Sequence, residues 1–265
     1  MKKIIIFLLL LLSIPSYSKD YHKTEDMINS ILTEENSSNT KKTEPAETVQ
    51  DQKTAGNEND KQKDKDKGEE EDSKKNSAMT GKDEVLLKTG IQLYESGLLD
   101  HSLVRFTDLI KNYPASPFLS SARMFAGKIY LKKYQYNEAI KQLDEINEKS
   151  GEYQAALFYK AEAYRYKGDP INAIEHYQKL SSSYPEHELA DNAILNAGKL
   201  YLNSNKGYQA LESAIKIIRY YKDRDTIDDA YYLIAKIYEK DPLLKDMEMS
   251  RKFYKIFLTK AEQNQ

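Results

Sequence analysis

The chain has 265 residues with 40 Lys and Arg against 42 Asp and Glu, so its net charge of −2 provides no basic field that would attract nucleic acid. Cysteine is absent, which excludes disulfides, cysteine-ligated metals, thiol catalysis and the lipid-bearing cysteine of a bacterial lipoprotein. Charged residues make up 31% of the chain, yet it also contains 21 Tyr, which indicates a polar part and a packed part.

The first 18 residues have the pattern of a secretory signal peptide. Lys2 and Lys3 precede an unbroken apolar run over 4–12, and Pro15 ends this region before the small residues near Ser18. A membrane span needs about 20 apolar residues, so the run is too short to be one. We expect cleavage near Ser18 and export to the periplasm or cell envelope, with an uncleaved anchor as the alternative.

Residues 19–82 form a charged linker for which we expect disorder. From residue 33 onward, its large apolar side chains are Val49 and Met79, too few to offset the entropy lost on ordering. Acidic and basic residues alternate in its centre, which favours a hydrated tether over a polycation that would bind nucleic acid.

A short apolar pattern interrupts this linker at residues 26–32. Met27, Ile28, Ile31 and Leu32 fall on one face of a helix. A helix of this length is marginal in isolation. The segment would therefore bind a partner or fold back onto the rest of the chain, unless the pattern arises by chance.

Between residues 83 and 260 the sequence repeats itself. A small residue recurs at steps of 37, 34, 37 and 37, at Gly90, Gly127, Ala161, Gly198 and Ala235. A second small residue follows the first four of these by 12 positions, at Ser102, Ala139, Ala173 and Ala210, whereas Ser250 follows the fifth by 15. The predicted repeats are 83–119, 120–153, 154–190, 191–227 and 228–260.

Each repeat is expected to contain two antiparallel helices, A and B, whose small residues allow close approach. Four tyrosines would pack between neighbouring repeats: Tyr130, Tyr164, Tyr201 and Tyr238. Gly97 and Gly168 stand where helix A must end. Three pairs have the pattern of an N-cap followed by proline at the first helical position: Ser116-Pro117, Asp169-Pro170 and Asp241-Pro242. The sequence therefore predicts an all-α solenoid of about five helix pairs.

This pattern resembles the tetratricopeptide-repeat (TPR) family, whose unit carries small residues at its eighth and twentieth positions and an aromatic residue at its eleventh. The resemblance implies a right-handed superhelical solenoid. Tyr113-Pro114-x-Ser116 and Tyr184-Pro185, in an exported chain, further resemble envelope TPR proteins of the BamD-like and CpoB-like types. The missing cysteine departs from the lipoprotein group among them.

In the TPR family, the A helices line a concave groove that binds partner segments. The positions of this chain that match the groove are mostly aromatic and cationic: Lys128, Leu131, Lys132, Phe158, Tyr159, Glu162, Arg165, Tyr166, Asn196, Lys199, Tyr232 and Lys236. Such a surface would hold an extended or helical peptide, with the rings supplying contact area and the cations bonding acidic groups. Alternatively, some of the rings form core between repeats.

No pattern in the sequence indicates catalysis, a metal or a cofactor. The zinc-protease, phosphate-loop, dinucleotide and nucleophile-elbow motifs do not occur. His22, His101, His176 and His187 are each expected at the solvated surface. We therefore expect a non-enzymatic protein.

The function that these features favour is a scaffold or adaptor for protein partners in the bacterial cell envelope. A self-assembling structural scaffold is one alternative, and an accessory regulator of envelope assembly or of a peptidoglycan enzyme is another. Peripheral membrane association also stays open.

The C-terminal end of the repeats is expected to need a cover. Phe253, Ile256 and Phe257 have no following repeat to pack against, although a solenoid needs a polar cap. A partner, a second copy of the chain bound through its C-terminal helix, or the segment 27–32 would supply it.

Overall fold

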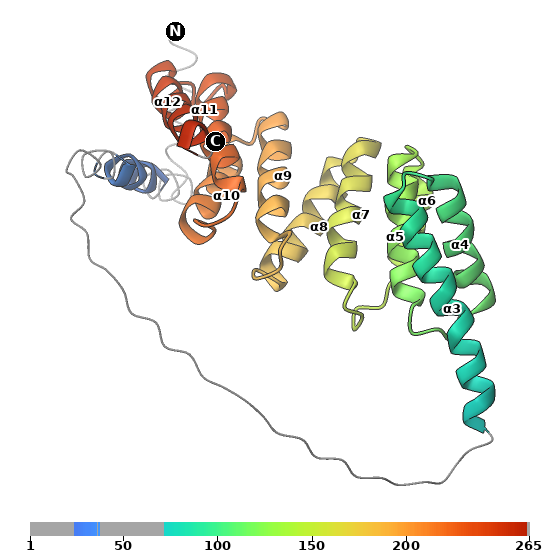
Figure 1. Cartoon of the computed structure of the whole chain (residues 1–265). Coiled ribbons are helices and arrows are strands. Elements are labelled where there is room, and N and C mark those ends of the chain that lie inside the picture. The colour runs from blue at the N-terminus through green and yellow to red at the C-terminus, as the bar shows by residue number, and fades with distance from the viewer. Residues whose placement is uncertain (1–23, 36, 38–71, 264–265) are drawn as a thin grey trace, which may run out of the picture.

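The computed structural model describes residues 24–35, 37 and 72–263 (Figure 1). The signal segment 1–18 and residues 38–71 of the linker lie outside the described part. Residues 24–35 are helical, over the segment where the apolar pattern was found.

The repeat region folds into helices that pack in consecutive pairs along one row (Figure 1). The pairs are α3 (Asp72–Glu95) with α4 (Leu99–Asn112), α5 (Leu119–Lys132) with α6 (Tyr136–Asp144), α7 (Tyr153–Lys167) with α8 (Pro170–Ser183), α9 (Ala190–Asn203) with α10 (Gly207–Tyr220), and α11 (Thr226–Lys240) with α12 (Met247–Gln263). The all-α fold of five helix pairs predicted from the repeats is confirmed.

Small residues lie where the two helices of a pair approach most closely. A Cβ atom added at Gly90 would lie 2.6 Å from the Phe106 ring, and one added at Gly127 would lie 2.8 Å from Leu143. Ser102 on α4 donates a hydrogen bond of 2.7 Å to the Gly90 carbonyl. The alanines of the repeat register are fully buried, at positions 139, 161, 173, 210 and 235. Larger side chains there would force the helices apart.

Three of the four repeated tyrosines connect the core of one repeat to that of the next. Tyr130 packs against the cores of the first and second repeats, and Tyr201 packs against those of the third and fourth. Tyr164 packs against the cores of the second and third repeats and stacks on His176 of its own pair, with ring centroids 5.5 Å apart. Tyr238 stacks at 6.1 Å on Phe253, which also belongs to its own pair. Tyr130, Tyr164 and Tyr201 therefore join the cores of neighbouring helix pairs.

Four of the five A helices are followed by a residue with positive φ. Gly97 and Gly168 have φ of 76° and 84°, and Tyr134 and Asn205 occupy the equivalent positions with φ of 60° and 56°. The fifth equivalent position is Pro242, whose ring fixes a negative φ. The last A–B connection therefore takes another path, which accommodates the three additional residues of this unit.

Two of the three predicted N-caps are wrong. Asp169 caps α8 as expected and accepts a hydrogen bond from the Asn172 amide. Ser116 precedes α5 by a turn and accepts from the Phe118 amide instead. Asp241 ends α11 and caps the following turn, because α12 begins at Met247. A hydrogen-bonded turn satisfies the same side chains as a helix start does, so the short motif does not distinguish the two.

Helix α3 begins earlier than the predicted repeat boundary at residue 83. It starts at Asp72, and its first turns include the good helix formers Lys74, Lys75 and Ala78. Asp83 is buried inside the helix and accepts a hydrogen bond from the Ser116 hydroxyl. A buried Asp83 thereby ties α3 to the turn before α5.

The helix at residues 24–35 lies against the C-terminal end of the row. Ile28 and Ile31 belong to the same buried core as residues of α9, α10, α11 and α12, and Figure 1 draws the segment in blue beside α10. Of the three covers expected for this end, the structure shows the chain's own segment.

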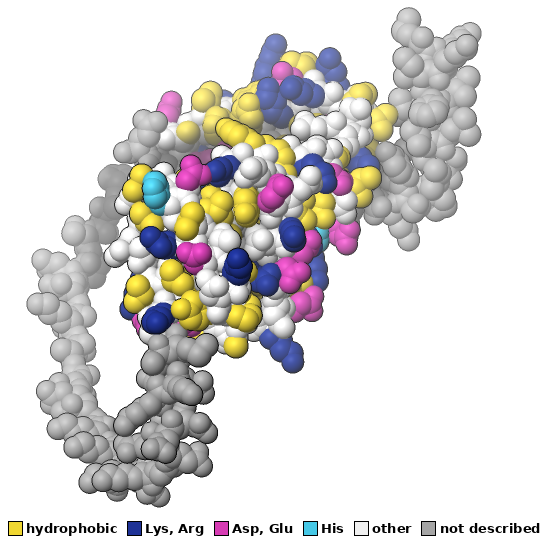
Figure 2. All heavy atoms as spheres, turned by 90° about the vertical axis from the view of Figure 1, so that its right-hand side faces the viewer, with side chains coloured by type: hydrophobic (Ala, Val, Ile, Leu, Met, Phe, Trp, Pro, Cys, Tyr) yellow, Lys and Arg dark blue, Asp and Glu magenta, His cyan; other side chains and the backbone are white. Residues whose placement is uncertain are grey.

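The opposite end of the row presents a mixed surface. Figure 2 views the molecule from the α3–α4 side, where hydrophobic, basic and acidic side chains are interspersed. Val85 and Val104 are among the exposed apolar residues of these helices.

Among the residues that the structure describes, no helix combines the length and apolar character needed to cross a bilayer.

Candidate binding face of the A helices

The A helices form one face of the row. Those of neighbouring repeats contact each other directly at three junctions: α3 with α5, α5 with α7, and α9 with α11. Successive B helices of the described part make no contact of that extent. Because the A layer is the more closely spaced one, it lies on the inside of the curve, where the resemblance places a binding groove.

An aromatic and lysine cluster occupies the α3–α5–α7 part of this face. The Lys128 ammonium lies 4.8 Å from the ring centroid of Tyr159, 5.4 Å from that of Phe125 and 5.7 Å from that of Tyr94. Lys132 lies 4.5 Å from the Tyr94 ring. Contacts at these distances are cation–π interactions. Neither lysine forms an ion pair with a carboxylate of the described part.

Tyr94 and Phe125 belong to this cluster but were not among the predicted groove residues. Their rings pack edge to face, with centroids 5.4 Å apart. Both occupy positions of the repeat at which the family lines its groove, so the signal was present in the same register.

A largely buried carboxylate organises the centre of the face. Glu162 on α7 accepts two hydrogen bonds from Arg165, of 2.5 and 3.1 Å, one of 3.0 Å from the Asn196 amide on α9, and one from the Tyr177 hydroxyl on α8. The side chain of Glu162 is 13% exposed. The α7 and α9 backbones are more widely separated than the other A-helix neighbours, and the Glu162–Asn196 bond spans this junction.

The charge of Glu162 changes the proton affinity of its donors. Partial burial opposes the charged form of Arg165, but its hydrogen bonds and attraction to Glu162 raise the pKa of the guanidinium. Burial, followed by the Glu162 charge, raises the pKa of Tyr177. Arg165 was expected to offer its guanidinium to a partner, whereas the structure shows it committed to Glu162. In the structure, Arg165 therefore stabilises Glu162 within the protein.

Tyr166 and Phe158 flank this centre in different ways. Tyr166 is exposed, stacks on Tyr136 at 6.0 Å and carries the Arg165 guanidinium 4.0 Å above its ring. Phe158 is half-buried and packs edge to face on Tyr177 at 5.7 Å. Phe158 therefore belongs mainly to the core between α7 and α8, while Tyr166 belongs to the surface.

The α9–α11 part of the face contains a hollow of 260 Å³. It is lined by Lys199, Leu202, Tyr232, Lys236 and Lys240, among others. Two of these lysines are paired at the rim, Lys199 with Asp229 and Lys236 with Glu239, each at 3.1 Å. The hollow thus combines an apolar floor with a rim rich in ammonium groups.

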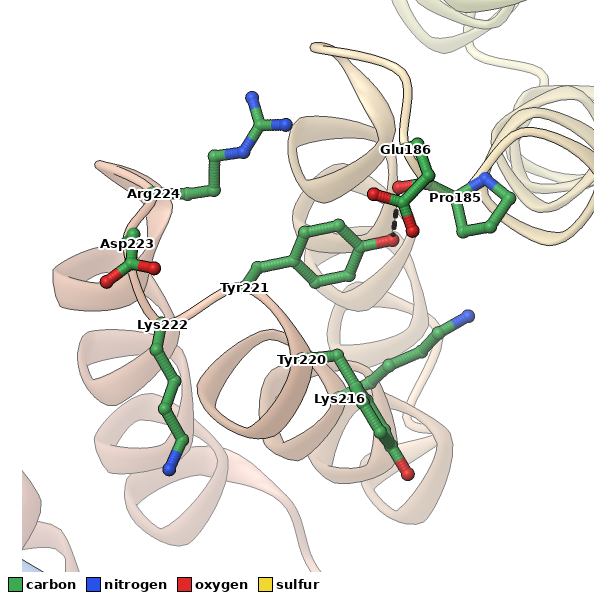
Figure 3. Close-up of a pocket in the computed structure, with 8 residues that line it drawn as sticks. All are labelled: Pro185, Glu186, Lys216, Tyr220, Tyr221, Lys222, Asp223 and Arg224. Carbon is green, nitrogen blue, oxygen red and sulfur yellow. Dashed lines mark hydrogen bonds between the residues drawn. The ribbon is translucent and has the colours of Figure 1, made fainter.

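A larger hollow of 440 Å³ lies away from this face, at the turns before α9 and α11 (Figure 3). The Tyr221 hydroxyl donates a hydrogen bond of 2.9 Å to the Pro185 carbonyl across it. Lys216 and Arg224 line it together with Glu186, so its charges are mixed. The link from Tyr221 to Pro185 indicates a structural role in holding the fourth repeat on the third.

The histidines provide no chemistry at the binding face. His22 lies outside the described residues, and His101 is exposed. His187 is half-buried, and its Nδ1 atom accepts from the Leu189 amide. His176 was expected at the solvated surface, but it is half-buried beside Tyr164, and burial lowers its pKa to about 4. Within the described ranges, no group of three or more acidic or histidine side chains is placed to hold a metal ion.

Comparisons with known proteins agree with the geometry. Residues 155–187, which span most of α7 and α8, match the family model described as tetratricopeptide repeat. No curated protein sequence matches the chain.

Solved structures resemble the repeat region over most of their own length. The crystal structure of MamA protein is 19% identical, with a TM-score of 0.58 over 69% of this chain and 93% of that one. A tetratricopeptide repeat protein from Parabacteroides merdae ATCC 43184 is 16% identical, with a TM-score of 0.58 over 69% and 68%. PilF of Pseudomonas aeruginosa is 15% identical, with a TM-score of 0.53 over 68% and 76%.

These likenesses establish the fold, because the identities are low. Tetratricopeptide repeats are in general protein-interaction modules and are usually non-catalytic, and no catalytic family matches this chain. Residues 155–187 match the tetratricopeptide-repeat model in sequence, and the helix pairs resemble solved tetratricopeptide-repeat structures in fold.

Proposed function

We propose that the chain is a non-catalytic scaffold of the bacterial cell envelope that binds an acidic segment of a protein partner on the face of its A helices. The observation that carries this proposal is the pair of lysines, Lys128 and Lys132, held among the rings of Tyr94, Phe125 and Tyr159 without a carboxylate partner in the described part. The other cations of the face are largely neutralised by their own neighbours.

The chemistry of this cluster favours a carboxylate ligand. Each ammonium has three N–H donors and no carboxylate of the described part accepts from them, so donors are available for an incoming acid. The rings also restrict the lysine side chains before binding, which reduces the entropy lost when a partner is bound. Flat aromatic surfaces beside the lysines would contact the apolar residues of the same segment.

A crosslinked pull-down tests the binding face. Reversing two charges, with Lys128→Glu and Lys132→Glu, is expected to weaken capture of an acidic partner by at least about tenfold, because like charges then face each other. The matched control carries Lys141→Glu and Lys149→Glu, two exposed lysines of α6 and of the turn that follows it. Both variants should keep the helical circular dichroism of the wild type. Equal capture by the two variants would contradict the proposal.

The envelope location is supported by the signal-peptide pattern of residues 1–18. Expression of the full chain, followed by fractionation and N-terminal sequencing, tests it. We expect a periplasmic or envelope-associated protein that begins at Lys19. A chain that stays in the cytoplasm with Met1 intact would refute the location and leave the binding face unaffected.

A further inference from the structure

The C-terminal end of the repeats is an apolar surface that the chain covers from its own N-terminal side. α12 is the last helix of the row, and Phe253 on it is fully buried. Ile256 and Phe257 pack against the same core. The helix at residues 24–35 lies over this end (Figure 1).

The apolar contact is extensive for so short a segment. Ile28 is 1% exposed and Ile31 is 3% exposed, so both side chains are inserted into the core of the last two repeats. Met27 and Leu32 pack beside them. All four belong to one face of the helix, which leaves its polar face to solvent.

A polar contact fixes the position of the helix at its C-terminal end. Glu35 accepts a hydrogen bond of 2.5 Å from the Tyr231 hydroxyl and forms an ion pair of 3.1 Å with Lys260. The Lys260 ammonium also lies 5.3 Å from the Tyr231 ring. The two charged side chains are 18% and 26% exposed, so water screens the pair only in part.

The segment is separate from the repeats along the chain. Residues 36–71 connect it to α3, and a chain of that length reaches at most about 120 Å when extended. Its helix has 12 residues, a length at which isolated helices are marginal in water. Its helical form therefore depends on the surface that it covers.

We propose that the end surface of α10, α11 and α12 is a binding site for an amphipathic helix, which the chain's own residues 24–35 occupy as a removable cap. The site takes a helix with apolar residues at the positions of Met27, Ile28, Ile31 and Leu32 and an acid at that of Glu35. A tethered helix of this kind is present at an effective concentration of about a millimolar. A free helix therefore binds only where the cap has been released.

A peptide-binding measurement on the full chain tests the proposal. The probe is a fluorescent peptide of residues 24–37, and the cap-released variant carries Ile28→Asp and Ile31→Asp. We expect the peptide to bind this variant at least about tenfold more tightly than the wild type, whose site is occupied. A peptide with the same two aspartates is the control and should bind neither protein.

Two results would overturn the proposal. Peptide binding to neither protein, with helicity intact, would mean that the end surface is no helix-binding site. Equal binding to both would mean that the wild-type surface is already free. Should the aspartate variant lose its helicity, Glu35→Lys replaces it as the milder release, and a second change, Lys260→Glu, should restore the cap.

Crosslinking decides which chain supplies the cap. The sequence contains no cysteine, so Glu35→Cys with Lys260→Cys gives a single reactive pair for a short bis-maleimide. A crosslinked monomer is expected. A crosslinked dimer would assign the cap to a second copy and contradict its binding within one chain. None of these tests uses the face of the A helices, so their failure would leave the function proposed above intact.

Discussion

Replacing Glu162 with glutamine should loosen the centre of the solenoid. The side chain joins α7, α8 and α9 through Arg165, Tyr177 and Asn196. Glutamine keeps the shape of the side chain but removes the charge on which these donors converge.

The magnitude follows from the burial of the group. Hydrogen bonds to a charged group contribute about 1.5–3 kcal/mol each. Removing one member of a fully buried ion pair costs about 3–5 kcal/mol, because the other charge is left buried without a partner. The side chain of Arg165 is 30% exposed, so solvent recovers part of that loss. We therefore expect Glu162→Gln to destabilise the fold by about 2 kcal/mol, which lowers the thermal midpoint by about 4–8 °C for a domain of this size.

Thermal unfolding followed by circular dichroism measures this loss. Glu138→Gln, at an exposed position of α6, is the matched control and should melt within about 0.5 kcal/mol of the wild type. A double-mutant cycle with Asn196→Ala should give a coupling of at least about 0.5 kcal/mol, because the two side chains are bonded. If Glu162→Gln and the control have the same melting temperature, the carboxylate does not organise the junction between α7 and α9.

Three further changes test other parts of the fold by the same melting assay. Gly90→Ala should destabilise the fold by about 1–3 kcal/mol, because its Cβ atom would meet the Phe106 ring. Gly81→Ala, at a position of α3 with open space around it, should instead stabilise the fold by up to about 1 kcal/mol. Equal effects of the two changes would contradict the close packing at Gly90. Burial holds the pKa of His176 at about 4 against 6.5 unfolded, so stability should fall as the pH drops from 6.5 towards 4, and His176→Phe should flatten that fall. Tyr134→Gly should be more stable than Tyr134→Val by at least about 1 kcal/mol, because φ there is 60°; the reverse order would contradict the strained turn.

The sequence predicts the helix pairs well because the repeat is enforced by packing. A position such as Gly127 must be small wherever two helices cross at short distance, so the same residue type returns in each unit. The tyrosine register follows for the same reason, since each ring fills an equivalent gap. Turn geometry is harder to predict from the sequence. Tyr134 adopts a positive φ at a position where Gly97 and Gly168 stand in other repeats, and a tyrosine does not indicate that conformation.

The candidate site is less predictable because charge pairing depends on neighbours in space. The composition of the face suggested a cationic groove, but Arg165, Lys199 and Lys236 are each paired with an acid of the same face. Two of these acids, Asp229 and Glu239, lie on α11 and were not among the predicted groove residues. Periodicity places residues on a face without saying which of them bond to one another.

The helix that covers the C-terminal end also depends on contacts that periodicity does not predict, here between residues far apart along the chain. The apolar pattern at 26–32 and the uncovered end of α12 are both visible in the sequence. The contact between Glu35 and Tyr231 joins residues 196 positions apart, and no local rule indicates it. The apolar character of both surfaces made the segment 27–32 one of three covers expected for this end, and the structure shows this segment in place.

Site-specific photocrosslinking in cells tests the proposed binding face most directly. A photoreactive phenylalanine analogue at Tyr159 would lie beside Lys128, and the same analogue at Tyr220, 75% exposed on α10, is the control. We expect an adduct with one partner from position 159. This adduct should be absent from position 220 and lost when Lys128→Glu and Lys132→Glu are added. An adduct from position 220 alone, or one from 159 that survives the charge reversal, would contradict binding of an acidic segment at the A helices.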